Sequence, residues 1–373
     1  MKTMKNLNKN TFFAIITTLF GMAFANNAAA QKIAGADLTY RHIAGNTYEI
    51  VANVSLDCTD VVSDSLTFNI DGCGNTPQMI KAVGVQVPDG QPINPGIPPT
   101  TCNGGTAFGA KKYVFKAMHT FTSVCNDWTV SIGACCRTNI ATINPTGTLP
   151  FYLDTHFSNA VANSSIDFST DNVATLCVNQ PFVYNHGFYD ADGDSITIEL
   201  ANVPTSVNGV AVYQAPFSLS NPLTTANGTT FLPQYGQLSF TPTVVGETTT
   251  IGFLIKKFRG NMLISRTLRE VFFAVTDNNN CINNTQNATL KNDFRLAPNP
   301  AHDFCTLYFD KNNARNVNIS VTNTFGRCVF LQKNVAVLDE MLQIPVGTWQ
   351  NGIYFIKIEN ERGGISIGKM IKM

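Results

Sequence analysis

Apolar and polar positions alternate with a period of two along most of this chain. In the segment from Tyr48 to Leu56 the apolar residues take every second place, while Glu49, Asn53 and Ser55 occupy the opposite face. Successive side chains of a β-strand point to opposite faces, so the pattern predicts strands with one buried face. The pattern recurs at residues 66–70, 113–117, 128–132, 196–200, 251–255, 271–275 and 317–321. No convincing amphipathic helix interrupts these segments, and the sequence therefore predicts an all-β fold built of sandwiches.

Composition divides the predicted strands into units. Between residues 277 and 293 the sequence turns to Asn and Thr, which cannot bury a core, and we place a linker at 281–295. We expect two consecutive β-sandwich domains before this linker, at 31–175 and 176–280. A small β-sandwich is expected after it, at 296–373.

Residues 1–30 have the features of a secretory signal peptide. Lys2, Lys5 and Lys9 precede an uncharged apolar run, and Ala28 and Ala30 supply a small-x-small cleavage site. The apolar run is shorter than the roughly 20 residues that a spanning helix needs, so no transmembrane helix is expected. Only 13% of the residues are charged and no basic patch stands out, which argues against a nucleic-acid partner.

The chain contains 10 cysteines, and in an exported protein these favour disulfides over zinc, because no C-x-x-C pair occurs. We expect the eight from Cys58 to Cys281 to be oxidised. Cys135 and Cys136 are neighbours, and the preferred Cα separation of a disulfide exceeds one peptide step. They are therefore expected to bond to two different strands rather than to each other.

The segment YDADGDSITIEL has the strongest pattern for metal binding. Asp190, Asp192 and Asp194 alternate around Gly193 and lead directly into a predicted strand, and three hard oxygen ligands in one tight turn suit calcium. The spacing is not that of an EF-hand. An ordinary turn capped by its own aspartates is the alternative.

This acidic segment is similar to the acidic turns of cadherin-like bacterial sandwiches. The resemblance makes residues 176–280 a cadherin-like or Ig-like domain and adds Asp277 and Asn279, in VTDNNN, as further calcium ligands. The same region also resembles a module repeated in large Bacteroidetes surface proteins, which implies display outside the cell.

Several separated motifs mark the last part of the chain. They are the Pro298, Asn299, Pro300 opening, the Gly326 and Arg327 turn, the Gly352, Ile353, Tyr354 strand start and the Lys369 to Lys372 end. Together they resemble the type A C-terminal sorting domain of proteins exported through the type IX secretion system of Bacteroidetes.

The resemblance implies a small Ig-like sandwich that directs passage from the periplasm across the outer membrane and is then cut off. The expected partners are the type IX machinery and its sorting protease, and the expected location is the outer-membrane surface or the medium. Cys305 and Cys328 lie inside this domain, and we expect them to form a local disulfide.

The last residues also spell G-x-S-x-G around Ser366, the pattern of a hydrolase nucleophile elbow. Such an elbow needs a following helix and a later His, and neither is expected in the few remaining residues. We interpret Ser366 as a strand residue, with no catalytic role.

These observations favour a non-enzymatic surface or secreted protein that contacts a matrix protein or a glycan. The alternative is a secreted hydrolase, or a polysaccharide-binding accessory, whose site is assembled from distant loops.

Overall fold

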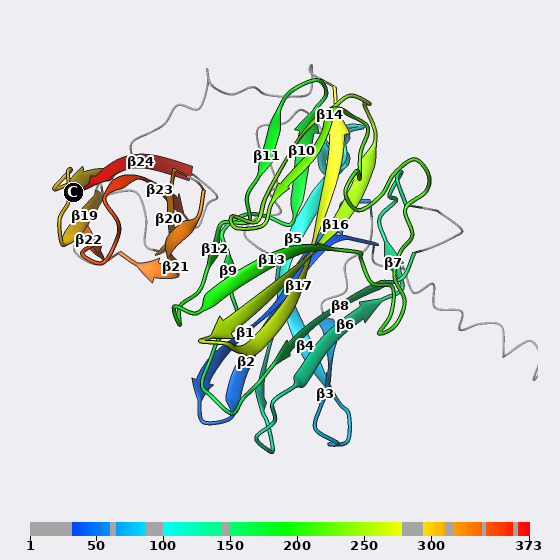
Figure 1. Cartoon of the computed structure of the whole chain (residues 1–373), viewed down its shortest axis with the longest axis horizontal. Coiled ribbons are helices and arrows are strands. Elements are labelled where there is room, and N and C mark those ends of the chain that lie inside the picture. The colour runs from blue at the N-terminus through cyan, green and yellow to red at the C-terminus, as the bar shows by residue number, and fades with distance from the viewer. Residues whose placement is uncertain are drawn as a thin grey trace, which may run out of the picture. The chain divides into compact units, whose positions relative to one another are not determined.

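The computed structural model describes residues 32–59, 65–86, 100–143, 149–277, 294–309, 316–324, 326–337, 341–360 and 365–373. These residues form β-strands and loops with one short 3-10 turn, η2 (Thr101–Asn103), and no α-helix (Figure 1). The all-β prediction is confirmed. No helix in the described ranges is long and apolar enough to cross a membrane.

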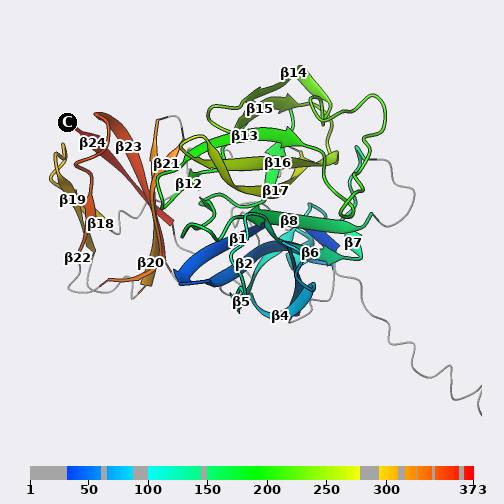
Figure 2. The ribbon, with the colours of Figure 1, turned by 60° about the horizontal axis from the view of Figure 1, so that its bottom comes forward.

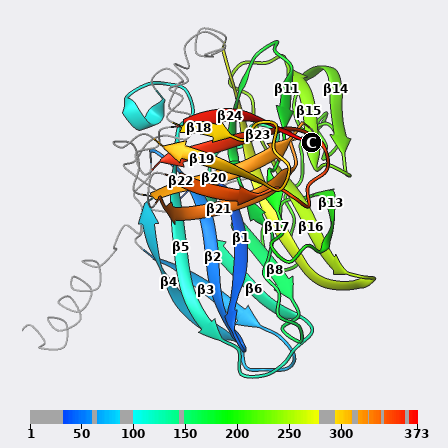
Figure 3. The same ribbon diagram turned by 90° about the vertical axis from the view of Figure 1, so that its left-hand side faces the viewer.

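The first unit is a closed ring of strands. Its hydrogen-bond ladder runs β17–β8–β6–β3–β4–β5–β2–β1, and β1 pairs with β17 again. Figure 3 shows β4, β5, β2 and β1 side by side in that order. The strands are β1 (Lys32–Ala44), β2 (Thr47–Asp57), β3 (Ser65–Asp71), β4 (Gln78–Gln86), β5 (Ala110–Thr120), β6 (Trp128–Ala134), β8 (Phe151–Phe157) and β17 (Met262–Thr276).

The alternating pattern explains the interior of this ring. In β2 the residues Tyr48, Ile50, Ala52 and Val54 are all buried, whereas their polar neighbours face outward. Tyr40 stacks on Phe157 with ring centroids 4.0 Å apart, and this pair anchors the aromatic part of the core. Most strands bury one face inside the ring, but β1 and β17 are buried on both faces over most of their length.

The second unit packs two sheets face to face. One sheet contains β13 (Ser195–Ala201), β16 (Thr248–Arg259), β17 and β10 (Val173–Cys177), and the other runs β11 (Phe182–Tyr184), β15 (Gln237–Pro242), β14 (Thr225–Leu232). Figure 2 shows β14 and β15 as a layer over β13, β16 and β17. Between the layers lies a second core that includes Phe240, Phe253 and Phe273. Short strands β7 (Cys136–Arg137), β9 (Asp167–Phe168) and β12 (Phe188–Tyr189) complete the two units.

β17 belongs to both units. Its early residues pair with β8 and its later residues with β10, while β16 follows it for almost its whole length. The boundary that we expected between residues 175 and 176 lies within β10, and the first ring is completed by a strand from residues 262–276. The two cores are separate, but they share a sheet because one long strand, β17, contributes to both units.

Two adjacent charges of β17 are buried on its opposite faces. Glu270 accepts two hydrogen bonds from Arg137, at 2.8 and 2.7 Å, and both side chains are 0% exposed. Arg269 is also fully buried, with its guanidinium 4.2 Å from the ring centroid of Phe168. The Arg137–Glu270 pair ties β7 to β17, and removal of either partner would leave a buried charge uncompensated.

Disulfides brace the first unit, as the sequence indicated. Cys58 bonds Cys102 and Cys73 bonds Cys125, and Cys177 is also disulfide-bonded. Cys281 lies outside the described residues. The expectation for Cys135 and Cys136 is wrong: they bond each other, with Cα atoms 3.7 Å apart. The pair sits where β6 ends and β7 begins, so the chain turns there and brings the two thiols together.

The C-terminal unit is a separate sandwich with its own core, as expected. One sheet runs β18 (Phe294–Ala297), β19 (Phe304–Phe309), β22 (Met341–Pro345), and the other runs β21 (Cys328–Ala336), β20 (Asn316–Asn323), β23 (Gly352–Asn360), β24 (Ile365–Lys372). Leu307, Ile319 and Ile356 are among the residues that meet between these sheets.

The expected Cys305–Cys328 disulfide is absent, since both cysteines are free and buried. Cys305 belongs to β19 and Cys328 to β21, so the two thiols start from different sheets. The Cys328 thiol instead donates to the carbonyl oxygen of Phe330 at 3.1 Å. Burial raises the pKa of each thiol to about 11, which keeps both cysteines protonated and unreactive at neutral pH.

Candidate functional site

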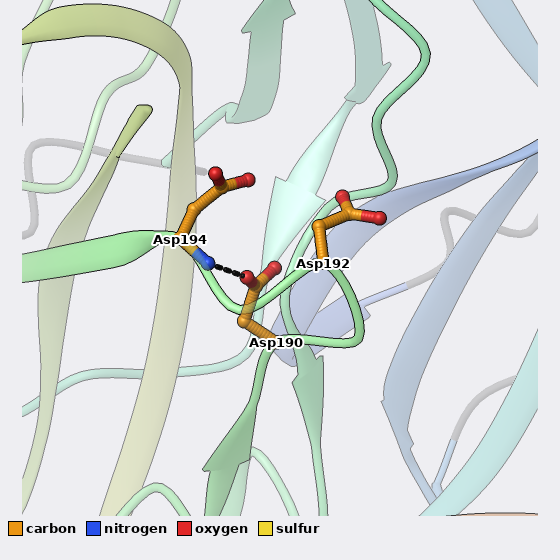
Figure 4. A group of neighbouring side chains, drawn as sticks. All are labelled: Asp190, Asp192 and Asp194. Atoms are coloured by element: carbon orange, nitrogen blue, oxygen red, sulfur yellow. Dashed lines mark hydrogen bonds between the residues drawn. The ribbon is translucent and has the colours of Figure 1, made fainter. Parts of the chain in front are cut away.

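The three aspartates of the acidic segment form one turn between β12 and β13. The backbone N–H of Asp194 donates to Asp190 Oδ2 at 2.6 Å (Figure 4). Gly193 adopts a left-handed φ of +75° that lets the chain reverse. The backbone N–H of Ser164 donates to Asp192 Oδ2 at 2.8 Å. One oxygen of each carboxylate lies within 4.8 Å of the others, so the sequence correctly grouped these side chains.

A lysine lies at the centre of this group. The Nζ atom of Lys257 is 2.5 Å from Asp190 Oδ1, 2.5 Å from Asp192 Oδ2 and 3.0 Å from Asp194 Oδ2. It also donates to the carbonyl oxygen of Ser164 at 2.7 Å. The side chain of Lys257 is 0% exposed, and the side chains of Asp190 and Asp194 are each 4% exposed. We call this arrangement of Lys257 and the three aspartates the lysine cage.

Arg259 closes one side of the lysine cage. It lies two residues after Lys257 on β16, and so on the same face, and it holds both oxygens of Asp194 at 2.8 Å. Hydrogen bonds from Arg259, followed by those from Lys257, keep the pKa of Asp194 below its usual range. Burial alone would lower the pKa of Lys257, but the surrounding carboxylates outweigh it and the pKa is raised. Both groups are therefore charged at neutral pH.

This geometry does not fit the calcium that we expected. A cation would take the point where the three carboxylates converge, and the Lys257 ammonium already takes it. A second positive charge at that point would be repelled by the ammonium. Three hard oxygen donors are present, but their negative charge is met by side chains of the protein itself.

The two further ligands do not join the cage. Lys257 pairs with Ser265 across the sheet, and residues 265–277 of extended chain span about 40 Å at about 3.3 Å per residue. Asp277 is therefore far from the other three aspartates, because it follows the opposite end of β17. Asn279 lies outside the described residues.

The sequence analysis did not identify Lys257 and Arg259 as site residues. The pattern that could have revealed them is in FLIKKFR, where two charged residues take alternate positions late in a strand whose inward face is otherwise apolar. An inward charge on a buried strand needs a partner, and the acidic turn was the nearest candidate.

Asn299 connects the start of the C-terminal unit to its last strand. Its amide donates to the carbonyl oxygen of Lys369 at 2.9 Å, and its oxygen accepts from the N–H of Ile371 at 2.8 Å. The next contact comes from Ala301, whose backbone N–H donates to the Ile371 carbonyl at 2.8 Å. The structure thus brings the Pro298, Asn299, Pro300 opening and the Lys369 to Lys372 end together along the edge of β24.

The other predicted sorting residues lie elsewhere in the same unit. Gly326 has a left-handed φ of +76° in the turn before β21. Gly352 pairs with Lys372, and Tyr354 pairs with Met370, in the ladder between β23 and β24. Tyr354 packs on Trp349 with ring centroids 5.1 Å apart, so it stabilises the core.

Ser366 lies within a strand ladder, as the second residue of β24. It pairs with Ile358 of β23, it is 4% exposed, and β24 continues to Lys372. A nucleophile elbow requires a sharp turn at the serine. The strand interpretation is confirmed, and the hydroxyl is buried instead of being presented to a substrate.

One loop of the second unit exposes several apolar side chains. Residues 202–224 connect β13 to β14, and Val207, Val210 and Val212 in this loop are 76%, 54% and 67% exposed. The loop is tied at its base, where the Ala211 N–H donates to the Val203 carbonyl at 2.8 Å. Exposed apolar side chains on an ordered loop are a feature of contact surfaces.

The family comparison matches the C-terminal part of the chain. Residues 295–373 match the family model described as "Secretion system C-terminal sorting domain". A search of the curated proteins found no match.

The search of the solved structures returned several matches at low identity. One concerns Dscam isoform specificity, with 9% identity over 92% of this chain and 72% of that chain, and a TM-score of 0.18. Another contains Sidekick-1 immunoglobulin domains 1–4, with 9% identity over 89% and 70% and a TM-score of 0.18. A titin I-band fragment has 9% identity over 91% and 97% and a TM-score of 0.16. At TM-scores this low the matches carry no information about the fold. The fold described above therefore rests on the strand pairing observed in this chain.

We predict that Lys257→Met destabilises the protein by about 3–5 kcal/mol, because the variant leaves three crowded carboxylates with Arg259 alone. Lys256→Met is the matched control, since Lys256 forms an exposed pair with Glu199 and its loss costs about 0–1 kcal/mol. Urea unfolding of the two variants measures the difference. Equal effects of the two substitutions would contradict the cage, and so would a wild-type melting temperature that rises in millimolar calcium.

Proposed function

Because residues 295–373 are a secretion system C-terminal sorting domain, we propose that this chain is a non-enzymatic binding protein that acts at the cell surface or in the medium. The domain implies export through the type IX secretion system, followed by attachment to the surface or release. The main support for export is that the residues of the sorting-domain match, 295–373, fold as a sandwich with its own core.

The proposal of a non-enzymatic role is supported by the surroundings of the two candidate catalytic features, the acidic turn and Ser366. The acidic turn is held by Lys257 and Arg259, so its carboxylates are committed to ion pairs. Ser366 is buried in a strand. General acid–base catalysis needs a group that can reach a substrate and exchange a proton with it, and neither feature offers one.

A role in contact with a matrix protein or a glycan is supported by the exposed valines of loop 202–224. They lie on a loop between β13 and β14 whose base is held by the Ala211–Val203 hydrogen bond, and a loop fixed on a β framework is the usual arrangement for binding. The framework fixes the loop, so binding would not require the ordering of a disordered segment.

Export should depend on the contact between Asn299 and β24. We expect Asn299→Ala to reduce the amount of protein that reaches the surface or the medium, because it removes two hydrogen bonds that hold the last strand. Deletion of residues 365–373 should trap the protein in the periplasm, since it exposes the unpaired edge of β23.

Fractionation of a bacterium with a type IX system measures this effect. Asn318→Ala is the control, because Asn318 contacts the Asn334 N–H in the same unit, away from β24. Undiminished export of the truncated protein would contradict a sorting role for this unit.

The binding role has its own test in an array of purified matrix proteins and glycans. We expect the mature protein to bind one component, and we expect Val207→Asp combined with Val210→Asp and Val212→Asp to weaken that binding at least about tenfold, by placing charges in an apolar contact. Val244→Asp is the control, at an exposed valine of another loop. Binding that the triple variant retains in full would refute the role of this loop, and turnover of an arrayed polysaccharide would favour a hydrolase.

A further inference from the structure

Lys257 and Asp190 are in contact at a place that water hardly reaches. Their Nζ and Oδ1 atoms are 2.5 Å apart, and the side chains are 0% and 4% exposed. The residues come from β16 and from the turn before β13, strands that are neighbours in the sheet. An amine and a carboxyl group are thus fixed against each other by two rigid elements.

The two oxygens of Asp190 have different surroundings. Oδ2 accepts the backbone N–H of Asp194 at 2.6 Å (Figure 4). Oδ1 is buried and faces the Lys257 ammonium, with no other hydrogen-bond partner among the described residues. Oδ2 is therefore held by a backbone donor, while the contact of Oδ1 is with Lys257.

We propose that Lys257 and Asp190 condense to form an intramolecular isopeptide bond, which joins Nζ to Cγ and cross-links β16 to the turn before β13. The ammonium and the carboxylate together contain the atoms of the amide and of one water molecule. No oxidant, reductant or further reactant is required.

The other members of the lysine cage account for the steps. The neutral amine must form first, and it forms by transfer of a proton from Nζ to Asp192, whose Oδ2 is 2.5 Å away. The nitrogen lone pair then attacks Cγ of Asp190, and the negative charge that develops on Oδ2 is stabilised by the Asp194 N–H.

The leaving group is the Oδ1 oxygen of Asp190. It departs as water when the C–Oδ1 bond breaks, after it receives the proton held by Asp192 and a second proton from the attacking nitrogen. Asp192 is 25% exposed, which gives this water a route to solvent. Arg259 stays paired with Asp194 throughout and takes no part in bond formation.

Two physical effects favour this bond. Groups fixed in contact react as if present at very high local concentration, which removes most of the entropic cost of condensation. The reaction also replaces the buried charges of Lys257 and Asp190 with a neutral amide, and so removes the desolvation penalty of that pair. It leaves Arg259 with two carboxylates, Asp192 and Asp194, whereas loss of the ammonium alone leaves it with three. The product would fasten the second unit covalently, which suits a protein exposed outside the cell.

Peptide mass spectrometry of the secreted wild-type protein tests the proposal. After reduction of the disulfides and digestion with trypsin and chymotrypsin, we expect a branched peptide that contains Asp190 and Lys257, about 18 Da lighter than the sum of its parts. Trypsin should not cut after Lys257, because its side chain is an amide. Fragmentation should locate the link at these two residues.

Variants give the matched comparison. Lys256→Met should keep the branched peptide, because Lys256 faces solvent and pairs with Glu199. Asp190→Ala should lose the branched peptide and restore cleavage after Lys257. An unlinked Lys257 peptide from the wild type would overturn the proposal, and a link from Lys257 to Asp192 would overturn the assignment of Asp190. The wild-type result decides even if a variant fails to fold.

Discussion

β17 is the strand on which the two N-terminal units depend. It closes the ring of the first unit through β1 and β8, and it forms the middle of a sheet of the second unit through β16 and β10. Leu268 packs in the core of the first unit, and Val271, Phe273 and Val275 pack in the core of the second, so a change in the position of β17 would disturb both. Arg269 and Glu270 fix that position, because each is buried on its own face with partners that no slipped register would satisfy.

The need of a buried charge for partners also explains the lysine cage, at the other end of this sheet. Lys257 lies on β16, paired with Ser265 of β17, and points into a region where an apolar residue would normally pack. A buried ammonium is stable only with anionic partners, and the acidic turn before β13 provides three of them. A cation from the protein itself therefore takes the place that the sequence pattern suggested for a metal ion.

The sequence predicted what depends on local pattern and missed what depends on distant partners. The alternation around Tyr48 to Leu56 forms the expected strand, and the motifs around Asn299 lie in the expected terminal sandwich. The acidic segment at Asp190 forms the turn that was the alternative to a calcium site. The contribution of β17 to two units could not be foreseen, because strand pairing across more than a hundred residues leaves no local signal. The prediction for Cys135 and Cys136 was wrong for a related reason. It relied on the usual Cα separation of disulfides, whereas the bend between β6 and β7 brings these neighbouring thiols together.

The most direct test of this account is hydrogen exchange of the intact protein in increasing denaturant, followed by mass spectrometry. Peptides from β2 report on the first core and peptides from β15 on the second. If β17 couples the two cores, their most protected amides should exchange with the same free energy of opening and the same dependence on denaturant. Two distinct free energies, with one core open while the other stays protected, would contradict the central role of the shared strand.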